Sequence, residues 1–171
     1  MALSMSMSTA KATIRGMNLA LQAIKVALTP EGGKKHTLVV GILKGAHTDV
    51  DDGELDKSVL IAPYAAMMEF GTRHIPARPF LRNTLAERQK EWVASIGQQI
   101  EQYGVKDLEK ALNDLGIQMT GDIKAKIMSG DFAPLSPKTI AAKERKGRPH
   151  PDLPLVDTAS MVNAIHHEVR K

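Results

Sequence analysis

Residues 84–128 read TLAERQKEWVASIGQQIEQYGVKDLEKALNDLGIQMTGDIKAKIM, and this stretch decides the fold. Its apolar residues recur at spacings of three, four and seven, which is typical of the buried face of a helix. The first series is Leu85, Trp92, Ile96, Ile100 and Tyr103, and the second is Leu108, Leu112, Leu115, Met119, Ile123 and Ile127. Gly104 separates the two series, so we expect two long helices packed as an antiparallel hairpin. Thr84 and Glu87 have capping-box spacing, which predicts that the first helix begins near residue 84.

The residues before this hairpin predict one more helix and a pair of strands. Residues 9–28 carry apolar residues at helical spacing and end at Thr29-Pro30, so we expect an amphipathic helix there. Residues 37–43 and 58–61 are β-branched and apolar, and they predict two paired antiparallel strands. The acidic residues 49–54 would form the connecting loop. They do not fit a calcium loop, because Gly53 comes one residue too early.

Shorter elements are expected on either side of the hairpin. Residues 64–70 predict a helix closed by Gly71, followed by an ordered loop over residues 72–79. Ser136 before Pro137 predicts the start of a basic helix that reaches about residue 146, and residues 147–154 predict an exposed loop. Asp157 is expected to cap a last helical turn over 158–165, and residues 166–169 to form a strand. The sequence thus predicts an α+β fold, with a small antiparallel sheet packed by helices.

Composition favours one folded unit over residues 1–171, made of an N-terminal part (9–103) and a C-terminal part (104–171). Hydrophobic residues make up 43% of the chain and charged residues 25%, which is ordinary for a globular protein. Cysteine is absent, which excludes disulfides and thiolate metal sites and suits a reducing cytoplasm. No apolar run reaches the roughly 20 residues that span a bilayer, and no signal peptide is expected.

The net charge of +4 alternates in blocks along the chain. Residues 1–35 carry +4, 36–72 carry −4, 73–90 carry +4, 91–131 carry −3 and 132–171 carry +3. A nucleic-acid module usually gathers its basic residues on one element and often adds aromatic side chains, which are only 4% here. Alternating blocks fit a protein contact surface at least as well.

Enzymatic chemistry is not expected. The six histidines lack metal-binding spacing, since His166 and His167 are neighbours and therefore point to different sides. Neither phosphate-binding glycine motif occurs, and the sequence has no nucleophile elbow. We therefore expect no catalytic residue, no metal and no cofactor.

The segment 64–82, YAAMMEFGTRHIPARPFLR, stands out from the rest of the chain. A helix end and a proline-restricted loop follow one another in it, and we expect Glu69 and Arg78 to close the loop as a charged clamp. Phe70 and Phe80 would bury the two ends of the loop. The candidate structural residues are Glu69, Phe70, Gly71, Thr72, Pro76, Arg78, Pro79 and Phe80.

This segment resembles the hallmark of the tail-completion, or neck, proteins of bacteriophages and prophages. The preceding VVGI at 39–42 fits the same pattern, as do PLSPKTI at 134–140 and PLVDT at 154–158, so the resemblance covers about residues 37–169. Ala159 stands where many relatives have glycine. The second element follows the first here, whereas it precedes it in other members, and we expect the two to meet in space.

The resemblance implies a structural virion protein, assembled in the host cytoplasm, that joins tail and head as a ring of six copies around the DNA channel. Its implied partners are itself, the tail-terminator and tail-tube proteins, and the head-closure or connector proteins. Weak nonspecific DNA contact is also expected. Alternatives are a tail-terminator ring protein or a basic DNA-binding accessory protein.

Two groups of residues are candidates for those contacts. Candidates for the subunit interface are Arg73, His74, Arg82, Asp157, Thr158 and Met161. Candidates for the channel or an acidic partner are Lys138, Lys143, Arg145, Lys146 and Arg148.

Overall fold

A computed structural model describes residues 3–7, 10–18, 23–30, 35–43 and 61–171. The strands are β1 (Leu3–Met7), β2 (Ala10–Asn18), β3 (Ala23–Pro30), β4 (His36–Ile42) and β5 (Ile165–Arg170). The helices are α1 (Ile61–Phe70), α2 (Phe80–Tyr103), α3 (Leu108–Met128), α4 (Pro137–Arg145) and α5 (Ser160–Asn163), with a 3-10 turn η1 (Val105–Asp107). The predicted α+β class is confirmed.

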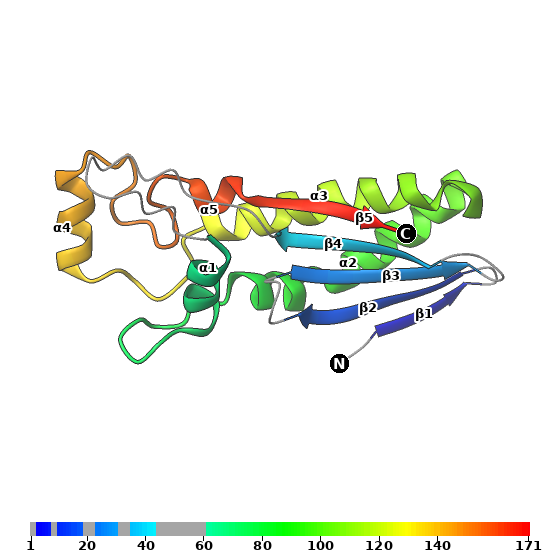
Figure 1. The fold of residues 1–171 in the computed structure, drawn as a ribbon, viewed down its shortest axis with the longest axis horizontal. Helices are drawn as coiled ribbons and strands as arrows, with labels where there is room; N and C mark the ends of the chain where they lie inside the picture. The colour runs from blue at the N-terminus through cyan, green and yellow to red at the C-terminus, as the bar shows by residue number, and fades with distance from the viewer. Residues whose placement is uncertain (1–2, 8–9, 19–22, 31–34, 44–60) are drawn as a thin grey trace.

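The strands form one antiparallel sheet in the order β1-β2-β3-β4-β5. Val26 of β3 lies opposite Leu38 of β4, and Val40 of β4 lies opposite His167 of β5. The long helices α2 and α3 lie along one side of the sheet, while α1, α4 and α5 gather beyond one of its ends (Figure 1). The molecule therefore has a sheet-and-hairpin body and a separate end built from short helices and loops.

The prediction of a helix over residues 9–28 is wrong, because the described part of this segment forms strands β2 and β3. Ile24, Val26 and Leu28 are all fully buried, whereas Lys25 and Ala27 between them are only partly so. Such alternation has the period of two of a strand. Ile24 and Leu28 are four residues apart, a spacing that fits a helix and a strand equally, and this ambiguity caused the error.

The predicted pairing of residues 37–43 with 58–61 is also wrong. The first strand exists as β4, but both of its neighbours are other strands, β3 and β5. Ile61 is instead the first residue of α1, and residues 58–60 lie outside the described part of the chain, as does the acidic segment 49–54. The C-terminal strand, expected at 166–169, is confirmed and takes the place beside β4.

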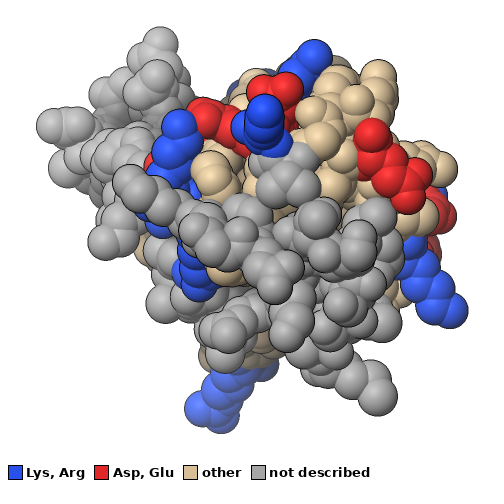
Figure 2. Space-filling model, turned by 90° about the vertical axis from the view of Figure 1, so that its right-hand side faces the viewer, with Lys and Arg blue, Asp and Glu red and all other residues tan. Residues whose placement is uncertain are grey.

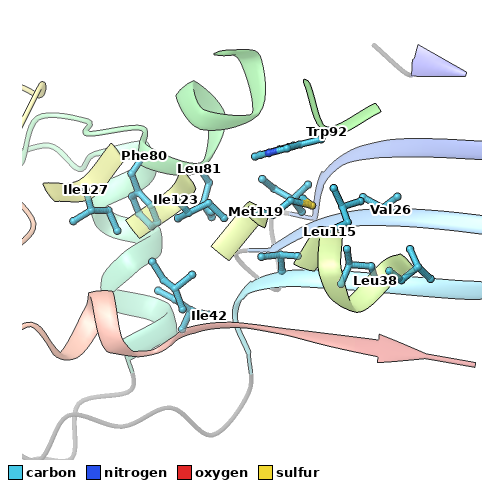
Figure 3. Close-up of a cluster of buried hydrophobic side chains, with 14 of the residues drawn as sticks. Val26, Leu38, Ile42, Phe80, Leu81, Trp92, Leu115, Met119, Ile123 and Ile127 are labelled. Atoms are coloured by element: carbon cyan, nitrogen blue, oxygen red, sulfur yellow. The ribbon is translucent and has the colours of Figure 1, made fainter. Parts of the chain in front are cut away.

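The helical hairpin is confirmed, and it supplies one wall of the core. The second apolar series of α3 is buried throughout, with each of its six side chains at most 2% exposed. Trp92 of α2, Met119 of α3 and Val26 of β3 belong to the same buried cluster, part of which is drawn in Figure 3. Helix α2 begins at Phe80 rather than near Thr84, whose hydroxyl donates 2.6 Å to the carbonyl oxygen of Phe80 within the first turn.

Polar contacts join α2 to α3 along their length. The indole nitrogen of Trp92 donates to Asp122 at 2.7 Å, and the hydroxyl of Tyr103 donates to Asp114 at 2.8 Å. Their positions run in opposite directions along the two helices, as an antiparallel hairpin requires. The contact with the Asp114 carboxylate also raises the pKa of Tyr103.

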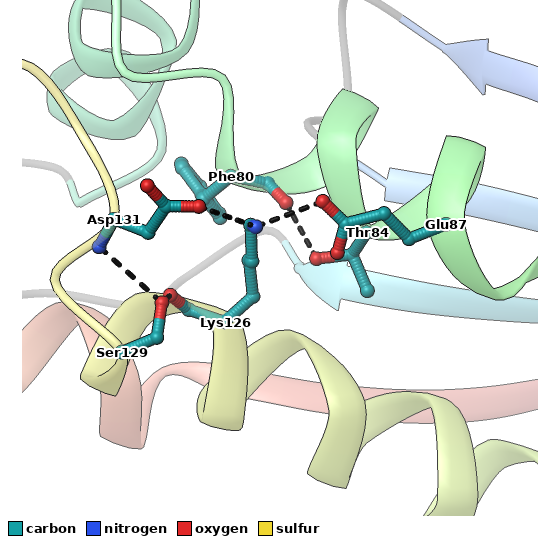
Figure 4. Close-up of polar contacts among 6 residues, drawn as sticks. All are labelled: Phe80, Thr84, Glu87, Lys126, Ser129 and Asp131. Carbon is teal, nitrogen blue, oxygen red and sulfur yellow. Dashed lines mark hydrogen bonds and ion pairs between the residues drawn. The ribbon is translucent and has the colours of Figure 1, made fainter.

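Lys126 ties the end of α3 to two other segments (Figure 4). Its ammonium lies 2.8 Å from Glu87 of α2 and 3.3 Å from Asp131 in the loop after α3. The hydrogen bond to Glu87 is the main cause that raises the pKa of Lys126. Lys126 therefore connects the loop after α3 to both helices of the hairpin.

Gly116 lets β5 approach α3 closely. A Cβ atom at this position would collide with the imidazole ring of His167 and touch a methyl group of Leu38. Burial against this surface lowers the pKa of His167. Within the described residues, no helix is both long enough and apolar enough to cross a membrane.

We predict that Leu115→Ala lowers the free energy of unfolding by about 2–5 kcal/mol, because it leaves a cavity between α3 and the sheet. Chemical denaturation followed by the fluorescence of Trp92, the only tryptophan, would measure this loss. Ile117→Ala is the matched control, since Ile117 is 64% exposed on the same helix, and its effect should stay within about 0.5 kcal/mol. Equal losses for the two variants would contradict the packing described.

Candidate functional site

The two segments that stood out in the sequence form one corner of the molecule, which we define as residues 61–82 and 132–158. It contains α1, the loop after it, the first residues of α2, and α4 with its flanking loops. These elements lie together beyond the end of the sheet (Figure 1). Three polar centres, at Glu69, Arg78 and Lys143, determine how its segments are held.

Glu69 places a buried carboxylate at the N-terminus of α2. Its side chain has no exposed surface, and its oxygens accept hydrogen bonds from the backbone N–H groups of Leu81 at 2.9 Å and Arg82 at 3.0 Å. The first N–H groups of a helix have no partner within it, and the helix dipole favours an anion there. Glu69 thus caps α2 from the neighbouring helix α1.

The partner of Glu69 is Arg82, so the predicted clamp between Glu69 and Arg78 is wrong. Arg82 Nε lies 3.0 Å from Glu69 Oε1, and its Nη2 donates 2.7 Å to the backbone carbonyl of Glu69. The physical reason is the early start of α2, which places Arg82 in the first helical turn, directly at the carboxylate. Because Arg82 makes this internal contact, only the exposed part of its side chain could also take part in the predicted subunit interface.

Arg78 instead joins the first segment to the second. It is only 4% exposed, and its guanidinium donates to the carbonyl oxygens of Ala133 at 2.8 Å and Pro134 at 3.1 Å. The backbone N–H of Arg78 donates to the carbonyl oxygen of Met68 at 2.7 Å, and this bond holds the loop against the end of α1. The structure thereby brings together the two elements that sequence analysis expected to meet.

The loop after α1 requires Gly71. Its φ of +74° lies in the left-handed region, and an added Cβ would come within 2.8 Å of the backbone nitrogen of Ala77. Thr72 closes the next turn, since its N–H donates 2.8 Å to the carbonyl of Ile75 and its hydroxyl accepts from the N–H of Ile75. The predicted helix end and ordered loop are confirmed.

The two phenylalanines of the segment differ. Phe80 is fully buried, as expected. Phe70 is 39% exposed, and the guanidinium of Arg82 lies 4.9 Å from the centre of its ring. The expectation that both would bury the loop is therefore wrong for Phe70, because its ring stacks against a surface arginine and not in the core.

Lys143 is an internal lysine, so its assignment to a channel or a partner surface is wrong. It is only 8% exposed, and its ammonium donates to the carbonyl oxygens of His150 at 3.2 Å, Leu153 at 2.9 Å and Val156 at 2.6 Å. Burial lowers its pKa, and the carboxylate of Asp157 opposes that effect. Lys143 thus holds the proline-rich loop 147–156 against α4. The predicted N-cap of α4 is confirmed, since the N–H of Thr139 donates to the hydroxyl oxygen of Ser136 at 3.2 Å.

Asp157 does not cap the last helix as predicted. It forms an ion pair with Arg148 at 3.1 Å, and α5 begins after Ala159, which has a φ of +61°. This is the position at which many members of the family that the sequence resembles have glycine. Alanine adopts this left-handed conformation at an energetic cost.

A hollow of about 240 Å³ opens where α1, α4 and the loop after α4 meet. Its lining is Tyr64, Leu135, Thr139, Ala142, Lys143, Lys146, Leu155, Val156 and Asp157. Burial raises the pKa of Tyr64, and Asp157 adds to the effect. The hollow has an apolar wall and a polar rim, and sequence analysis gave no sign of it.

The remaining candidates separate into exposed and buried positions. Arg73, His74 and Thr158 are exposed, as a contact with another subunit requires. Met161 is only 5% exposed and belongs to the core, so its assignment to the interface is wrong: α5 turns it inward. The described basic residues Lys138, Arg145 and Lys146 are exposed on or next to α4, and Arg148 is partly buried at its ion pair.

The corner exposes large apolar side chains on α1 and basic side chains on α4. Among the residues that the structure describes, no group of three or more His, Cys, Asp or Glu could hold a metal ion. Sequence analysis missed the exposed positions Tyr64 and Met67, although they and Phe70 recur every third residue along α1. That spacing was the available signal.

Comparisons with known proteins found no match to a family model, to a curated protein or to a solved structure.

We predict that Glu69 and Arg82 are energetically coupled. In a double-mutant cycle of Glu69→Ala and Arg82→Ala, the interaction free energy should be about 0.5–1 kcal/mol, because the side chain of Arg82 is 47% exposed to water. Glu69→Ala should cost more than Arg82→Ala, because it removes the acceptor of two backbone N–H groups as well. The cycle of Glu69→Ala with Arg78→Ala is the control and should show the smaller interaction free energy. A larger interaction free energy for Glu69 and Arg78 than for Glu69 and Arg82 would instead support the clamp that the sequence predicted.

Lys143→Met should lower the free energy of unfolding by about 1–3 kcal/mol or more, because three carbonyl oxygens lose their donor inside the protein. Lys138→Met is the matched control on the same helix, and since Lys138 is exposed its effect should remain within about 0.5 kcal/mol. Urea denaturation of both variants provides the comparison. Limited proteolysis should also cut the loop 147–156 faster in Lys143→Met; unchanged stability and unchanged cleavage would refute the role of the ammonium.

Proposed function

We propose that this chain is a structural virion protein of the tail-completion, or neck, type, which joins a phage tail to the head as a ring. One observation carries the proposal: the two segments that resemble the family are far apart in the sequence but fold into one corner. The contacts of Arg78 with Ala133 and Pro134 and the shared hollow join them. A chance likeness in two separate segments would give no reason for them to meet.

The division of residues within the corner also supports a contact role. Its buried polar groups hold the backbone, whereas Arg73 and His74 stand exposed on a loop that Gly71 and Thr72 hold in shape. A preorganised loop loses little entropy when a partner binds it. The exposed loop tip is therefore suited to recognise a neighbouring subunit.

The test is sedimentation of the purified protein with phage tails assembled without it. We expect the protein to be a monomer by mass measurement when alone and to form rings only on tails, because a junction protein must not polymerise early. Arg73→Glu should weaken tail binding, while Lys90→Glu on the exposed surface of α2 should not. Failure of the native protein to sediment with any such tails would count against the neck assignment.

The purified protein also distinguishes the neck protein from the two alternatives, a DNA-binding accessory protein and a tail terminator. A DNA-binding accessory protein should bind duplex DNA with an affinity that falls steeply as salt increases, and should ignore tails. A tail terminator should bind tails whose tube has not been capped and should block further growth of the tube. We expect binding to completed tails and only weak DNA affinity.

A further inference from the structure

Helix α1 presents an apolar stripe to solvent. Tyr64, Met67 and Phe70 are 39%, 41% and 39% exposed, and they account for three of the five exposed large hydrophobic side chains among the described residues. They recur every third residue and so lie along one side of the helix. Tyr64 also lines the hollow, which makes the stripe and the apolar wall of Leu135 and Leu155 parts of one surface.

The same corner has a net positive charge. In residues 61–82 three arginines face one acid, and in residues 132–158 five lysines and arginines face three acids, which gives a net +4. Four of the eight cations, Arg78, Arg82, Lys143 and Arg148, make the internal contacts described above. Lys138 and Arg145 are exposed on α4, the helix that supplies Thr139 and Ala142 to the lining of the hollow. At the opposite end of the molecule, charged residues of both signs are interspersed among the described residues (Figure 2).

We propose that the hollow and the α1 stripe together form a docking site for an acidic peptide segment of a partner protein, anchored by one apolar side chain. The anchor would enter the hollow between Ala142 and Leu155, and its flanking carboxylates would lie against Lys138 and Arg145. Tyr64 and Met67 would cover the peptide from α1. Charge complementarity selects the occupant, because the surface pairs an apolar wall with a net positive rim.

A peptide fits this surface better than a nucleic acid. The side chains of Met67 and Phe70 offer a phosphate group no hydrogen bond, and the acids Glu144, Asp152 and Asp157 lie among the basic residues in the sequence. A duplex-binding surface normally presents cations without such interruptions. The apolar hollow, in contrast, matches the pockets that hold the anchor residues of protein interfaces.

This inference deepens the proposed function and rests on it for the identity of the partner as a neighbouring virion subunit. The binding itself is measured on the purified chain, without tails. Failure of the peptide experiment would therefore remove the docking site and leave the neck assignment open, whereas failure of the tail experiment would remove the neck assignment alone.

The test is fluorescence anisotropy of a short dye-labelled peptide in which a central leucine is flanked by glutamates. Two probe controls replace the glutamates by glutamines or the leucine by serine. We expect saturable binding of the first peptide and binding at least about fivefold weaker for each control, a loss of about 1 kcal/mol. Equal binding of all three peptides, or no binding, would overturn the proposal.

Protein variants locate the site. Ala142→Leu, which fills the hollow, and the double variant Lys138→Glu with Arg145→Glu should each weaken binding at least about fivefold, again about 1 kcal/mol. The double variant Lys90→Glu with Lys106→Glu changes the net charge equally on exposed residues outside the corner and should bind like the native protein. A similar loss in this control, or tighter binding to duplex DNA than to the peptide, would refute the docking site.

Discussion

Glu69 holds a carboxylate with no exposed surface under the first turn of α2, and the geometry of the whole corner depends on this contact. A buried carboxylate is costly unless hydrogen bonds satisfy its oxygens. Here two backbone N–H groups and a guanidinium do so. Because the donors belong to α2 and the acceptor to α1, the contact sets both where α2 begins and how the loop between the helices must turn.

The backbone donors matter more than the ion pair. Arg82 has 47% of its side chain exposed, and a pair with so much water access contributes about 0–1 kcal/mol. Hydrogen bonds from N–H groups to a charged acceptor contribute more, about 1.5–3 kcal/mol each. The surface pair of Arg88 and Glu91, with both side chains about half exposed, falls in the weak class as well.

Lys143 repeats the same principle with opposite sign. The carboxylate of Glu69 accepts hydrogen bonds from free N–H groups at the start of a helix. The ammonium of Lys143 donates hydrogen bonds to free carbonyl groups of a loop. Arg78 donates to two further backbone carbonyls, those of Ala133 and Pro134. Each of these three charged groups forms at least two hydrogen bonds with backbone atoms.

The helical hairpin could be predicted because its apolar period is regular over 44 residues from Leu85 to Met128. The strand β4 and the N-cap at Ser136 could also be predicted, since the residue types of each segment and of its immediate neighbours in the sequence determine both. The helix prediction for residues 9–28 was wrong because Ile24 and Leu28 fit the period of a helix and that of a strand at once. The partners of Glu69, Arg78 and Lys143 could not be predicted, because each is fixed by tertiary packing: the start of α2 at Phe80, and the distant carbonyls at Ala133 and Val156.

The most direct test of this account is residue-resolved amide hydrogen exchange of Leu81 and Arg82 in the native protein and in Glu69→Ala. The account predicts slow exchange of both amides in the native protein and much faster exchange in the variant, under conditions where the amides in the middle of α3 remain protected. Amides that exchange as fast in the native protein as in an unstructured chain, or that stay equally protected in Glu69→Ala, would contradict the claim that this carboxylate caps α2.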